Sequence, residues 1–492
     1  METLYSRLQQ QATLSLREVA ILETDRALTY AELLGRTDDV AVRLRRAGTE
    51  AGDRVALVLP NGSEFVQAFF AVAAVGGVAV PLNPALREPE LAALMEDGPV
   101  AAVVTVSDLR DRCVGALQLV SSGVDVPVLL TGGEGQVAPV VDSGTEAGPA
   151  ASPGDPVLCL YSSGSTGRPK RVIRTQGNLL WETDRFTAAL GLGSADRVLG
   201  VAPFSHVNGL MRSMVASVLS GATLVPLAQF ERRAVGRTIQ ERRVTVFTGV
   251  PFMFAMLAET RWPQPVSFSS LRLCFSSSAP LPPETIQRFL ERYGVRVRQL
   301  YGTTETGTIA LDGAPEPAPT AECLGVALDG VEVDIFSEDR RPVRVGDSGD
   351  IGIRSPAATR EYPGLPDQNT LSFWNGYFFP GDVGYKDPAG RIYLVGRKSL
   401  FINRGGFKVN PYEIEALIRQ HPKVADIAVI GVDTEYGDQK IKAVVVPRER
   451  CAELEIIDFC REQMADFKVP SIVEFRTELP KSSTGKLLRK DL

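Results

Sequence analysis

The sequence predicts an α/β protein with a large N-terminal domain and a small α+β C-terminal domain, and three observations support this. The chain has 492 residues, too many for one ordinary domain. Along most of its length, short apolar runs alternate with longer amphipathic segments, which favours largely parallel sheets covered by helices. Beyond about Val331 closely spaced strand-like runs replace this alternation, which indicates a change of architecture.

The first part of the chain contains the elements of the predicted parallel sheets. Residues Ala31–Ala47 and Glu284–Tyr293 have the apolar spacing of amphipathic helices. Buried strands are expected where short apolar runs are bounded by turn residues, at Arg54–Leu59, Val78–Leu82, Thr223–Leu227, Val244–Phe247 and Leu271–Phe275. Gly132–Pro156 is rich in Gly, Ser, Pro and acidic residues, and predicts an exposed connection.

One uncharged stretch, Phe65–Leu82, is long enough to span a bilayer. Gly76 and Gly77 divide it into a helix-like half and a β-branched half, so a buried helix followed by a buried strand is the better interpretation. The first twenty residues contain acidic and polar side chains and no signal-peptide core. We therefore expect a soluble protein.

The second part of the chain predicts two further units. The runs at residues 331–336, 350–355 and 391–396 are separated by turn signals and predict an antiparallel β subdomain. After Gly396 a compact unit is expected, with a domain boundary at Arg397–Lys398. Its predicted elements are helix Pro411–Arg419, strand Asp426–Val432, strand Ile441–Val446, helix Leu454–Ala465 and strand Ile472–Phe475.

Charge and composition narrow the possible functions. A net charge of −6 gives no general attraction for nucleic acid or for an anionic membrane. The six cysteines contain no CxxC pair, which suggests reduced thiols in a cytoplasmic protein. The only histidines are His206 and His421, so a histidine-rich metal site is excluded.

The most informative segment is Tyr161–Lys170, with the sequence YSSGSTGRPK. It follows an apolar run, Val157–Leu160, that reads as a strand. Glycines let the backbone curl so that several N–H groups face one anion, while hydroxyls and a lysine add donors and charge. We predict a phosphate-binding loop; the alternative is a flexible surface turn.

This loop differs from two other phosphate-binding motifs. A Walker loop needs four residues between its glycines and a Lys-Ser/Thr pair that leads into a helix. Here two residues separate Gly164 from Gly167, Lys170 is followed by Arg171, and residues 172–173 read as another strand. The segment also lacks the GxGxxG pattern of dinucleotide-binding turns.

Residues Tyr161–Lys170 resemble the phosphate-binding loop of the adenylate-forming superfamily, which contains acyl-CoA synthetases, nonribosomal-peptide adenylation domains and luciferases. The other motifs that resemble this superfamily occur in its order and cover nearly the whole chain. They are LTYAEL (Leu28–Leu33), PFSHVNGL (Pro203–Leu210), SSSAP (Ser276–Pro280), YGTTE (Tyr301–Glu305), GDVG (Gly381–Gly384), GRK (Gly396–Lys398), INRGGFKVNPYEIE (Ile402–Glu415) and PKSSTGK (Pro480–Lys486). The chain is most similar to the stand-alone acyl-CoA synthetases.

The resemblance implies stacked α/β subdomains plus a β subdomain in an AMP-binding domain, residues 1–397, and a mobile C-terminal domain, residues 398–492. It also implies a two-step reaction. ATP with Mg²⁺ would convert a carboxylic acid to an acyl-AMP and pyrophosphate, and CoA would then accept the acyl group as a thioester. Forming the acyl-AMP gives the carboxylate a good leaving group, AMP, provided that the site neutralises charge along the reaction line.

The resemblance also assigns roles to individual residues. Lys486 would bridge the attacking carboxylate and the α-phosphate, Thr304 would donate to the α-phosphate, and Glu305 would bind Mg²⁺. Tyr301 would lie against adenine and Asp382 would accept the ribose hydroxyls. The full set expected to bind nucleotide or thiol is Ser162, Ser163, Gly164, Ser165, Thr166, Gly167, Lys170, Ser278, Ala279, Pro280, Tyr301, Gly302, Thr303, Asp382, Arg397, Gly405, Gly406, Phe407 and Lys408.

The resemblance places the acid beside His206 and implies that this residue would take part in catalysis by shifting as the thiol enters; the alternative is a structural histidine. Amino-acid-activating domains typically have an aspartate here to hold the α-ammonium group, so an α-amino acid is not expected. Aliphatic, aromatic and hydroxylated acids remain open, in fatty-acid, aryl-acid or secondary metabolism. The residues expected to contact the acid are His206, Val207, Asn208, Gly209, Ser276 and Ser277.

For the second step, the resemblance implies that the C-terminal domain rotates about a hinge at Lys398, where the family often has aspartate. Lys486 would leave the site, and residues 405–408 would enter, because paired glycines let backbone approach a pantetheine arm closely. Two positions depart from the family pattern. Arg171 stands where glycine is common, and Asn403 where lysine is frequent.

Three alternatives remain open at this point. The acceptor can be the phosphopantetheine of an acyl carrier protein, although no carrier domain follows Lys486 in the sequence. The chain can be a nucleotide-binding protein that has lost catalysis, although Lys486 and Glu305 are both present. A luciferase-type oxidation has no distinguishing residue here.

Overall fold

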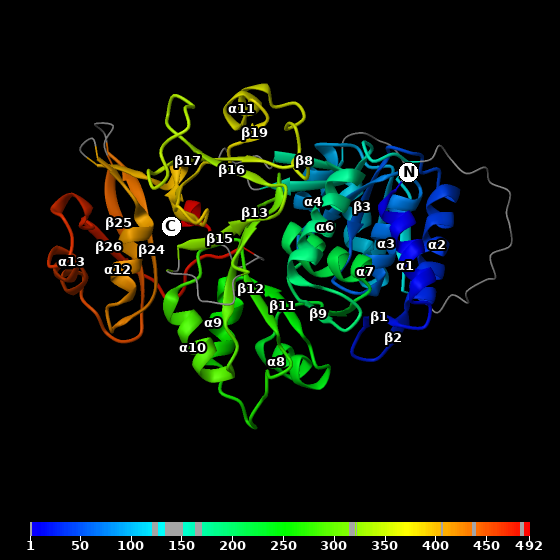
Figure 1. The fold of residues 1–492 in the computed structure, drawn as a ribbon, viewed down its shortest axis with the longest axis horizontal. Coiled ribbons are helices and arrows are strands. Elements are labelled where there is room, and N and C mark those ends of the chain that lie inside the picture. The colour runs from blue at the N-terminus through cyan, green and yellow to red at the C-terminus, as the bar shows by residue number, and fades with distance from the viewer. Residues whose placement is uncertain are drawn as a thin grey trace. The chain divides into compact units, whose positions relative to one another are not determined.

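The computed structural model describes residues 2–120, 126–132, 151–162, 170–313, 320, 322–404, 407–434, 439–482 and 487–492. The chain forms two compact units (Figure 1). The first contains Met1–Val333 and Ile353–Phe378, and the second contains Asp334–Gly352 and Phe379–Leu492. The domain boundary expected at Arg397–Lys398 stays a prediction.

The first unit begins with a six-stranded sheet in the order β6-β5-β3-β4-β7-β8. All neighbours are parallel except β7 and β8, which form an antiparallel pair. The strands are β3 (Arg54–Val58), β4 (Val78–Leu82), β5 (Ala102–Val106), β6 (Val128–Thr131), β7 (Pro156–Ser162) and β8 (Lys170–Thr175). The helices of this part are α1 (Leu4–Leu14), α2 (Tyr30–Arg46), α3 (Ser63–Ala74), α4 (Glu88–Glu96) and α5 (Arg110–Gln118).

Local sequence signals explain two of these elements. Helix α2 starts at a capping box, in which the Thr29 side chain accepts the Glu32 N–H and the Glu32 carboxylate accepts the Thr29 N–H. The uncharged stretch Phe65–Leu82 forms buried α3 followed by buried β4, so its interpretation as helix and strand is confirmed. In the described part of the chain, no helix combines the length and apolar character needed to cross a membrane.

A second sheet of the first unit contains strands in the order β15-β14-β13-β12-β11-β9-β10-β1-β2. The central strands from β1 to β13 are parallel, while β2, β14 and β15 pair antiparallel. The strands are β1 (Val19–Leu22), β2 (Ala27–Thr29), β9 (Arg197–Gly200), β10 (Thr223–Pro226), β11 (Val246–Gly249), β12 (Leu273–Ser276), β13 (Val297–Thr303), β14 (Gly307–Leu311) and β15 (Cys323–Ala327). The helices are α6 (Gln176–Leu190), α7 (Ala216–Ser220), α8 (Arg232–Glu241), α9 (Pro251–Glu259) and α10 (Pro283–Tyr293).

The predicted strand at Val244–Phe247 was placed two residues too early, because β11 begins at Val246. The chain is still turning at Arg243, whose φ is 51°. Thr245 then bonds across to the start of β9, since its hydroxyl accepts the Arg197 N–H at 2.9 Å. Apolar character alone does not reveal such a turn.

Between β9 and α7 the chain forms a π-helix, η2 (Asn208–Val215), in which every residue is buried. Such i→i+5 turns are rare and often occur at functional sites. Gly209 permits a close approach here, because a Cβ atom at this position would lie 2.3 Å from the Ala202 carbonyl oxygen and 2.4 Å from that of Pro203. The start of η2 therefore packs directly against the backbone of the preceding loop.

Gly209→Ala is expected to lower the free energy of unfolding by about 1–3 kcal/mol, the usual cost of overpacking, because backbone must move to admit the methyl group. Chemical denaturation measures this difference. Gly193→Ala is the matched control, since a Cβ atom there would meet nothing within 4 Å. Equal stability of the two variants would contradict the close approach at Gly209.

The second unit begins with an antiparallel part, as predicted. Strand β17 pairs antiparallel with β20, and β20 pairs antiparallel with β21. The strands are β16 (Glu332–Phe336), β17 (Gly349–Arg354), β20 (Asp382–Lys386) and β21 (Ile392–Arg397). The segment within Ile353–Phe378, which belongs to the first unit, carries α11 (Pro366–Ser372), β18 (Phe373–Trp374) and β19 (Tyr377–Phe378).

The end of the chain forms the predicted small α+β unit. A three-stranded sheet, β24-β25-β26, is covered by two helices around a core that includes Ile414, Ile418, Val429 and Ile441. Its elements are β22 (Ile402–Arg404), β23 (Phe407–Val409), α12 (Pro411–Arg419), β24 (Val424–Asp433), β25 (Gln439–Pro447), α13 (Glu453–Arg461) and β26 (Ile472–Phe475). The predicted fold class is confirmed, although α13 ends four residues before the expected Ala465.

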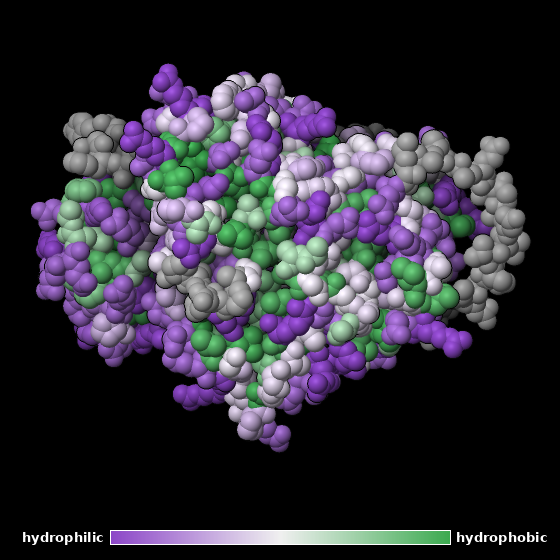
Figure 2. All heavy atoms as spheres, viewed as in Figure 1, coloured by the Kyte–Doolittle hydropathy of each residue, from purple (hydrophilic) through white to green (hydrophobic). Residues whose placement is uncertain are grey.

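Figure 2 shows hydrophilic and hydrophobic residues interspersed over the face drawn.

Candidate functional site

The predicted phosphate loop is the connection of a β-hairpin. Its first described residue, Ser162, is the register partner of Lys170 in the antiparallel pair β7–β8. The expected strand at residues 172–173 lies inside β8, so Lys170 begins a strand and not the helix that follows a Walker loop. Residues 163–169 lie outside the described residues.

Lys170 and Glu305 both contact the same aromatic residue, Tyr362. Its Nζ lies 4.7 Å from the centroid of the Tyr362 ring. Tyr362 Oη donates to Glu305 Oε1 at 3.0 Å, and Lys170 Nζ donates to Gln368 Oε1 at 2.8 Å. Burial lowers the pKa of Lys170, while the nearby charge of Glu305 opposes this shift. The structure thus brings together the ammonium group predicted to bind phosphate and the carboxylate predicted to bind Mg²⁺.

Sequence reasoning did not identify Tyr362, because no residue pattern around it marks a site. Burial, followed by the charge of Glu305 and the hydrogen bond to it, raises the pKa of Tyr362. The phenol therefore stays protonated and serves Glu305 as a donor. It positions the carboxylate that the resemblance assigns to the metal.

Glu305 itself sits in the turn of the β13–β14 hairpin. The Thr306 N–H donates to Thr303 Oγ1 at 3.1 Å, and the hydroxyls of these two threonines lie 2.9 Å apart. The Glu305 carbonyl accepts the Thr359 N–H at 2.7 Å. Thr304, at the tip, is half-buried, whereas Glu305 is buried. These bonds hold the turn in one conformation.

The other predicted residues of the first unit gather at the carboxyl ends of parallel strands β11, β12 and β13. Ligands of parallel α/β sheets usually bind at this edge. The Ser277 N–H donates to the Gly249 carbonyl at 3.1 Å, and Asn208 Nδ2 donates to the same carbonyl at 3.4 Å. The SSSAP segment begins with the last residue of β12, and the YGTTE segment begins inside the neighbouring parallel strand β13.

Ser278, Ala279 and Pro280 are exposed after β12. Ser278 has a φ of 73°, a left-handed conformation that non-glycine residues rarely adopt. Strain of this kind concentrates at functional sites. By contrast Tyr301, predicted to lie against adenine, is 8% exposed within β13, and Gly302 and Thr303 follow it half-buried.

His206 precedes η2 and is half-buried. Its N–H donates to the Pro203 carbonyl and its own carbonyl accepts the Leu210 N–H, each at 3.0 Å. Its Nδ1 accepts the Asn208 N–H at 3.4 Å. The residues that follow, 207–209, are buried. His206 therefore lies two residues before the π-helix, and its predicted role in catalysis stays a prediction.

Sequence reasoning missed Arg212, which lies one helical turn after Asn208. Its Nε donates to Thr308 Oγ1 at 3.0 Å, and its Nη1 lies 3.4 Å from both Asn208 Oδ1 and Ser277 Oγ. Burial lowers its pKa to about 10, while the charge of Glu182 opposes this shift. The i,i+4 spacing from Asn208, on the helix that carries predicted substrate residues, was the signal that could have found it.

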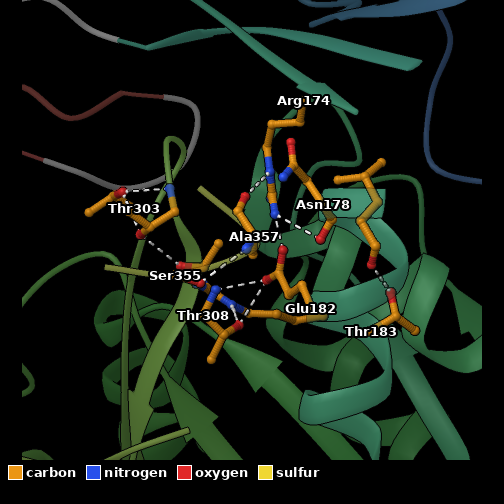
Figure 3. A network of polar contacts seen from close by, with 12 residues as sticks. Arg174, Asn178, Glu182, Thr183, Thr303, Thr308, Ser355 and Ala357 are labelled. Atoms are coloured by element: carbon orange, nitrogen blue, oxygen red, sulfur yellow. Dashed lines mark hydrogen bonds and ion pairs between the residues drawn. The ribbon is translucent and has the colours of Figure 1, made fainter. Parts of the chain in front are cut away.

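Behind this edge lies a buried ion pair, shown in Figure 3. Arg174 Nη1 lies 2.8 Å from Glu182 Oε2, and both side chains are almost fully buried. Glu182 Oε1 accepts the Thr308 N–H at 2.8 Å and the Thr308 hydroxyl at 3.0 Å, while Arg174 Nε donates to the Ala357 carbonyl at 3.2 Å. The pair thus ties β8, α6 and β14 together beneath the turn that carries Glu305.

Asp382 and Arg397 belong to the second unit, where they are register partners on β20 and β21. Arg397 Nε donates to Asp382 Oδ1 at 2.6 Å, and Asp382 is 2% exposed. The predicted hinge residue, Lys398, forms a 2.6 Å ion pair with Asp350, and its N–H donates to the Gly381 carbonyl at 2.8 Å. The structure therefore brings together the two residues expected to contact ribose.

Several predicted residues cannot be placed. Those outside the described residues are Ser163, Gly164, Ser165, Thr166, Gly167, Gly405, Gly406 and Lys486. Phe407 and Lys408 have a described backbone in β23, but their side chains are not described. Among the described residues, no three His, Cys, Asp or Glu side chains form a metal-binding group. Glu305 nevertheless suits Mg²⁺, which is often held by one carboxylate together with substrate phosphates.

Comparisons with known proteins match the chain over its whole length. The family description "AMP-binding enzyme" matches residues 8–363, and "AMP-binding enzyme C-terminal domain" matches residues 413–486. A feruloyl-CoA synthase of Amycolatopsis sp is 33% identical over 98% of this chain and 96% of that protein. An oxalate–CoA ligase of Arabidopsis thaliana is 32% identical over 94% and 92%.

Solved structures agree. ATP-bound MatB from Rhodopseudomonas palustris has a TM-score of 0.90 at 28% identity and covers 99% of this chain and 97% of that one. The O-succinylbenzoate coenzyme A synthetase MenE from Bacillus subtilis, in complex with AMP, has a TM-score of 0.86 at 27% identity over 100% and 98%.

Proposed function

Because this chain belongs to the AMP-binding enzyme family and is an AMP-forming acid–CoA ligase, we propose how its own residues divide the work of the two steps. In the first step a carboxylate oxygen attacks the α-phosphorus of ATP, a P–O bond forms, and the bond to pyrophosphate breaks. In the second step the CoA sulfur attacks the acyl carbon and AMP leaves. The observation that supports these roles best is the convergence of Lys170 and Glu305 on Tyr362.

In the first step, Lys170 and the loop that precedes it bind the β- and γ-phosphates. Thr304 donates to the α-phosphate, and Glu305 holds Mg²⁺, which when bound neutralises phosphate charge. The exposed residues after β12 and the β13 residue Tyr301 bind adenine. Asp382 accepts the ribose hydroxyls, and Arg397 fixes the orientation of its carboxylate.

The proposed division of work between the two steps rests on Lys486 and Lys398. Lys486 bridges the carboxylate and the α-phosphate during adenylation. Rotation about Lys398 then replaces it with residues 405–408, whose adjacent glycines admit the pantetheine arm. CoA, rather than a carrier protein, is the proposed acceptor. We place the reaction in the cytoplasm. The six cysteines all lie in the described part of the chain and are free thiols, which is consistent with this placement.

The test of the function is carboxylate-dependent exchange between ATP and labelled pyrophosphate over a panel of acids, followed by detection of the CoA thioester. At least one acid outside the α-amino acids is expected to support exchange and to yield a thioester. A second set of reactions replaces CoA with phosphopantetheinylated carrier proteins. Exchange without any CoA thioester, but with loading of a carrier protein, would contradict CoA as acceptor.

Glu305→Gln is expected to slow adenylation by roughly 10- to 100-fold, the range for losing one interaction with a charged group. The variant should also need more Mg²⁺ for its half-maximal rate, because an amide binds the cation less strongly than a carboxylate. Steady-state exchange rates at increasing Mg²⁺ measure both effects. Tyr362→Phe is the matched control, since it removes the donor to Glu305 and leaves the carboxylate. An unchanged Mg²⁺ requirement in Glu305→Gln would contradict this role.

A further inference from the structure

Arg212 is a buried cation whose hydrogen-bonding groups are incompletely used. The residue is 2% exposed. Its two Nη1 contacts, with Asn208 and Ser277, are long at 3.4 Å. Its Nη2 has no partner among the residues that the structure describes. An unused donor on a buried charged group is costly, so its presence calls for an explanation, of which a bound ligand is one.

The charges around Arg212 do not balance. The carboxylate whose charge acts on Arg212 is that of Glu182, which forms an ion pair with Arg174 and accepts two hydrogen bonds from Thr308 (Figure 3). Within the described ranges, Arg174, Arg212 and Glu182 therefore form a buried network of two positive charges and one negative charge. One anion is missing from this network.

A second unpartnered donor lies on the neighbouring strand. Ser276 is 1% exposed, and its Oγ makes no hydrogen bond with any described residue. It precedes Ser277, which Arg212 contacts. On the other side, a Cβ atom at Gly302 would lie 2.2 Å from Arg212 Nη2, so this nitrogen lies against the predicted nucleotide-binding backbone. The unused donors thus occur at the carboxyl ends of β12 and β13, among the residues expected to contact the acid.

We propose that Arg212, together with Ser276, determines the acid specificity of the enzyme by binding a second anionic group on the substrate, which makes a small dicarboxylic acid the preferred class. This inference rests on the proposed function. The reacting carboxylate cannot supply the missing anion throughout, because it becomes a neutral acyl group when it joins AMP. A second carboxylate keeps its charge through both steps and stays paired with the guanidinium.

The test compares kcat/KM for adenylation with acids matched in chain length: propanoate with malonate, butanoate with succinate, pentanoate with glutarate. The wild-type enzyme is expected to favour at least one dicarboxylate over its partner by 10-fold or more, the range for a hydrogen bond to a charged group. Arg212→Met is expected to lose this preference and to retain its kcat/KM for the monocarboxylate. Arg272→Met is the matched control, because Arg272 pairs with Asp196 outside this network.

Preference of the wild-type enzyme for monocarboxylates, or an unchanged preference in Arg212→Met, would overturn the inference and leave the proposed function standing. Exchange with no acid at all would overturn both. The kinetic result for Arg212→Met is interpreted only if AMP still raises the melting temperature of the variant, which shows that the variant folds and binds nucleotide. If Arg212→Met fails to fold, Ser276→Ala provides the test. A fall in kcat/KM confined to the dicarboxylate supports the inference, and an unchanged ratio of kcat/KM between the two acids overturns it.

Discussion

Glu182→Ala is expected to lower the free energy of unfolding by about 3–5 kcal/mol, the cost of leaving a buried charge uncompensated. Arg174 and Arg212 would then share the interior without a carboxylate, and the Thr308 N–H would lose its acceptor. Since domains are stable by only about 5–15 kcal/mol, the variant should be substantially unfolded at modest denaturant concentrations. Urea titration followed by circular dichroism measures the difference.

Two further variants separate charge from hydrogen bonding at this position. Glu182→Gln retains an oxygen for Thr308 and removes only the charge, so its loss should be smaller. Arg174→Met combined with Glu182→Leu removes both partners, and this double replacement should recover part of the stability. If Glu182→Ala unfolds at the same urea concentration as the wild-type protein, the ion pair does not contribute as described.

Lys486→Ala is expected to slow adenylation by roughly 10²–10³-fold, the usual cost of removing one group that stabilises charge in a transition state. The ammonium group is proposed to bridge two anions, the attacking carboxylate and the α-phosphate, that otherwise repel each other. It is not needed after the acyl-AMP has formed. Thioester formation from presynthesised acyl-AMP should therefore remain within a few-fold of the wild-type rate.

Single-turnover measurements of each step test this division. Lys490→Ala is the matched control, since Lys490 is an exposed lysine four residues away in the chain. This control should leave both steps unchanged. Equal loss of both steps in Lys486→Ala would contradict the exchange of residues between them.

Much of the fold was predictable because apolar runs and turn residues mark buried elements. Strand β4 and helix α12 have the predicted limits, Val78–Leu82 and Pro411–Arg419, because each is bounded by residues that end regular structure. The start of β11 was wrong by two residues, because the turn at Arg243 depends on contacts with β9 rather than on local sequence. Element types follow from short-range pattern, whereas limits follow from tertiary contacts.

The candidate site was predictable where a motif carries it and not elsewhere. Ser162 and Lys170 were both assigned to the phosphate-binding segment, and they are register partners in the pair β7–β8. Tyr362 and Arg212 were missed, because their roles depend on partners at Glu305 and Thr308 that are distant in the sequence. Such partners become visible only once the chain has folded.

The π-helix η2 has a consequence for how binding preferences can change in this lineage. A π-turn contains one residue more than an α-turn, so losing a single residue within Asn208–Val215 would let the segment relax to ordinary α-helical winding. The segments on either side would then keep their facing, because the tighter winding absorbs the missing residue, and only the side chains within the former π-turn would change direction. A deletion in this segment would therefore displace the Arg212 guanidinium, on which the proposed acid preference rests, in one mutational event.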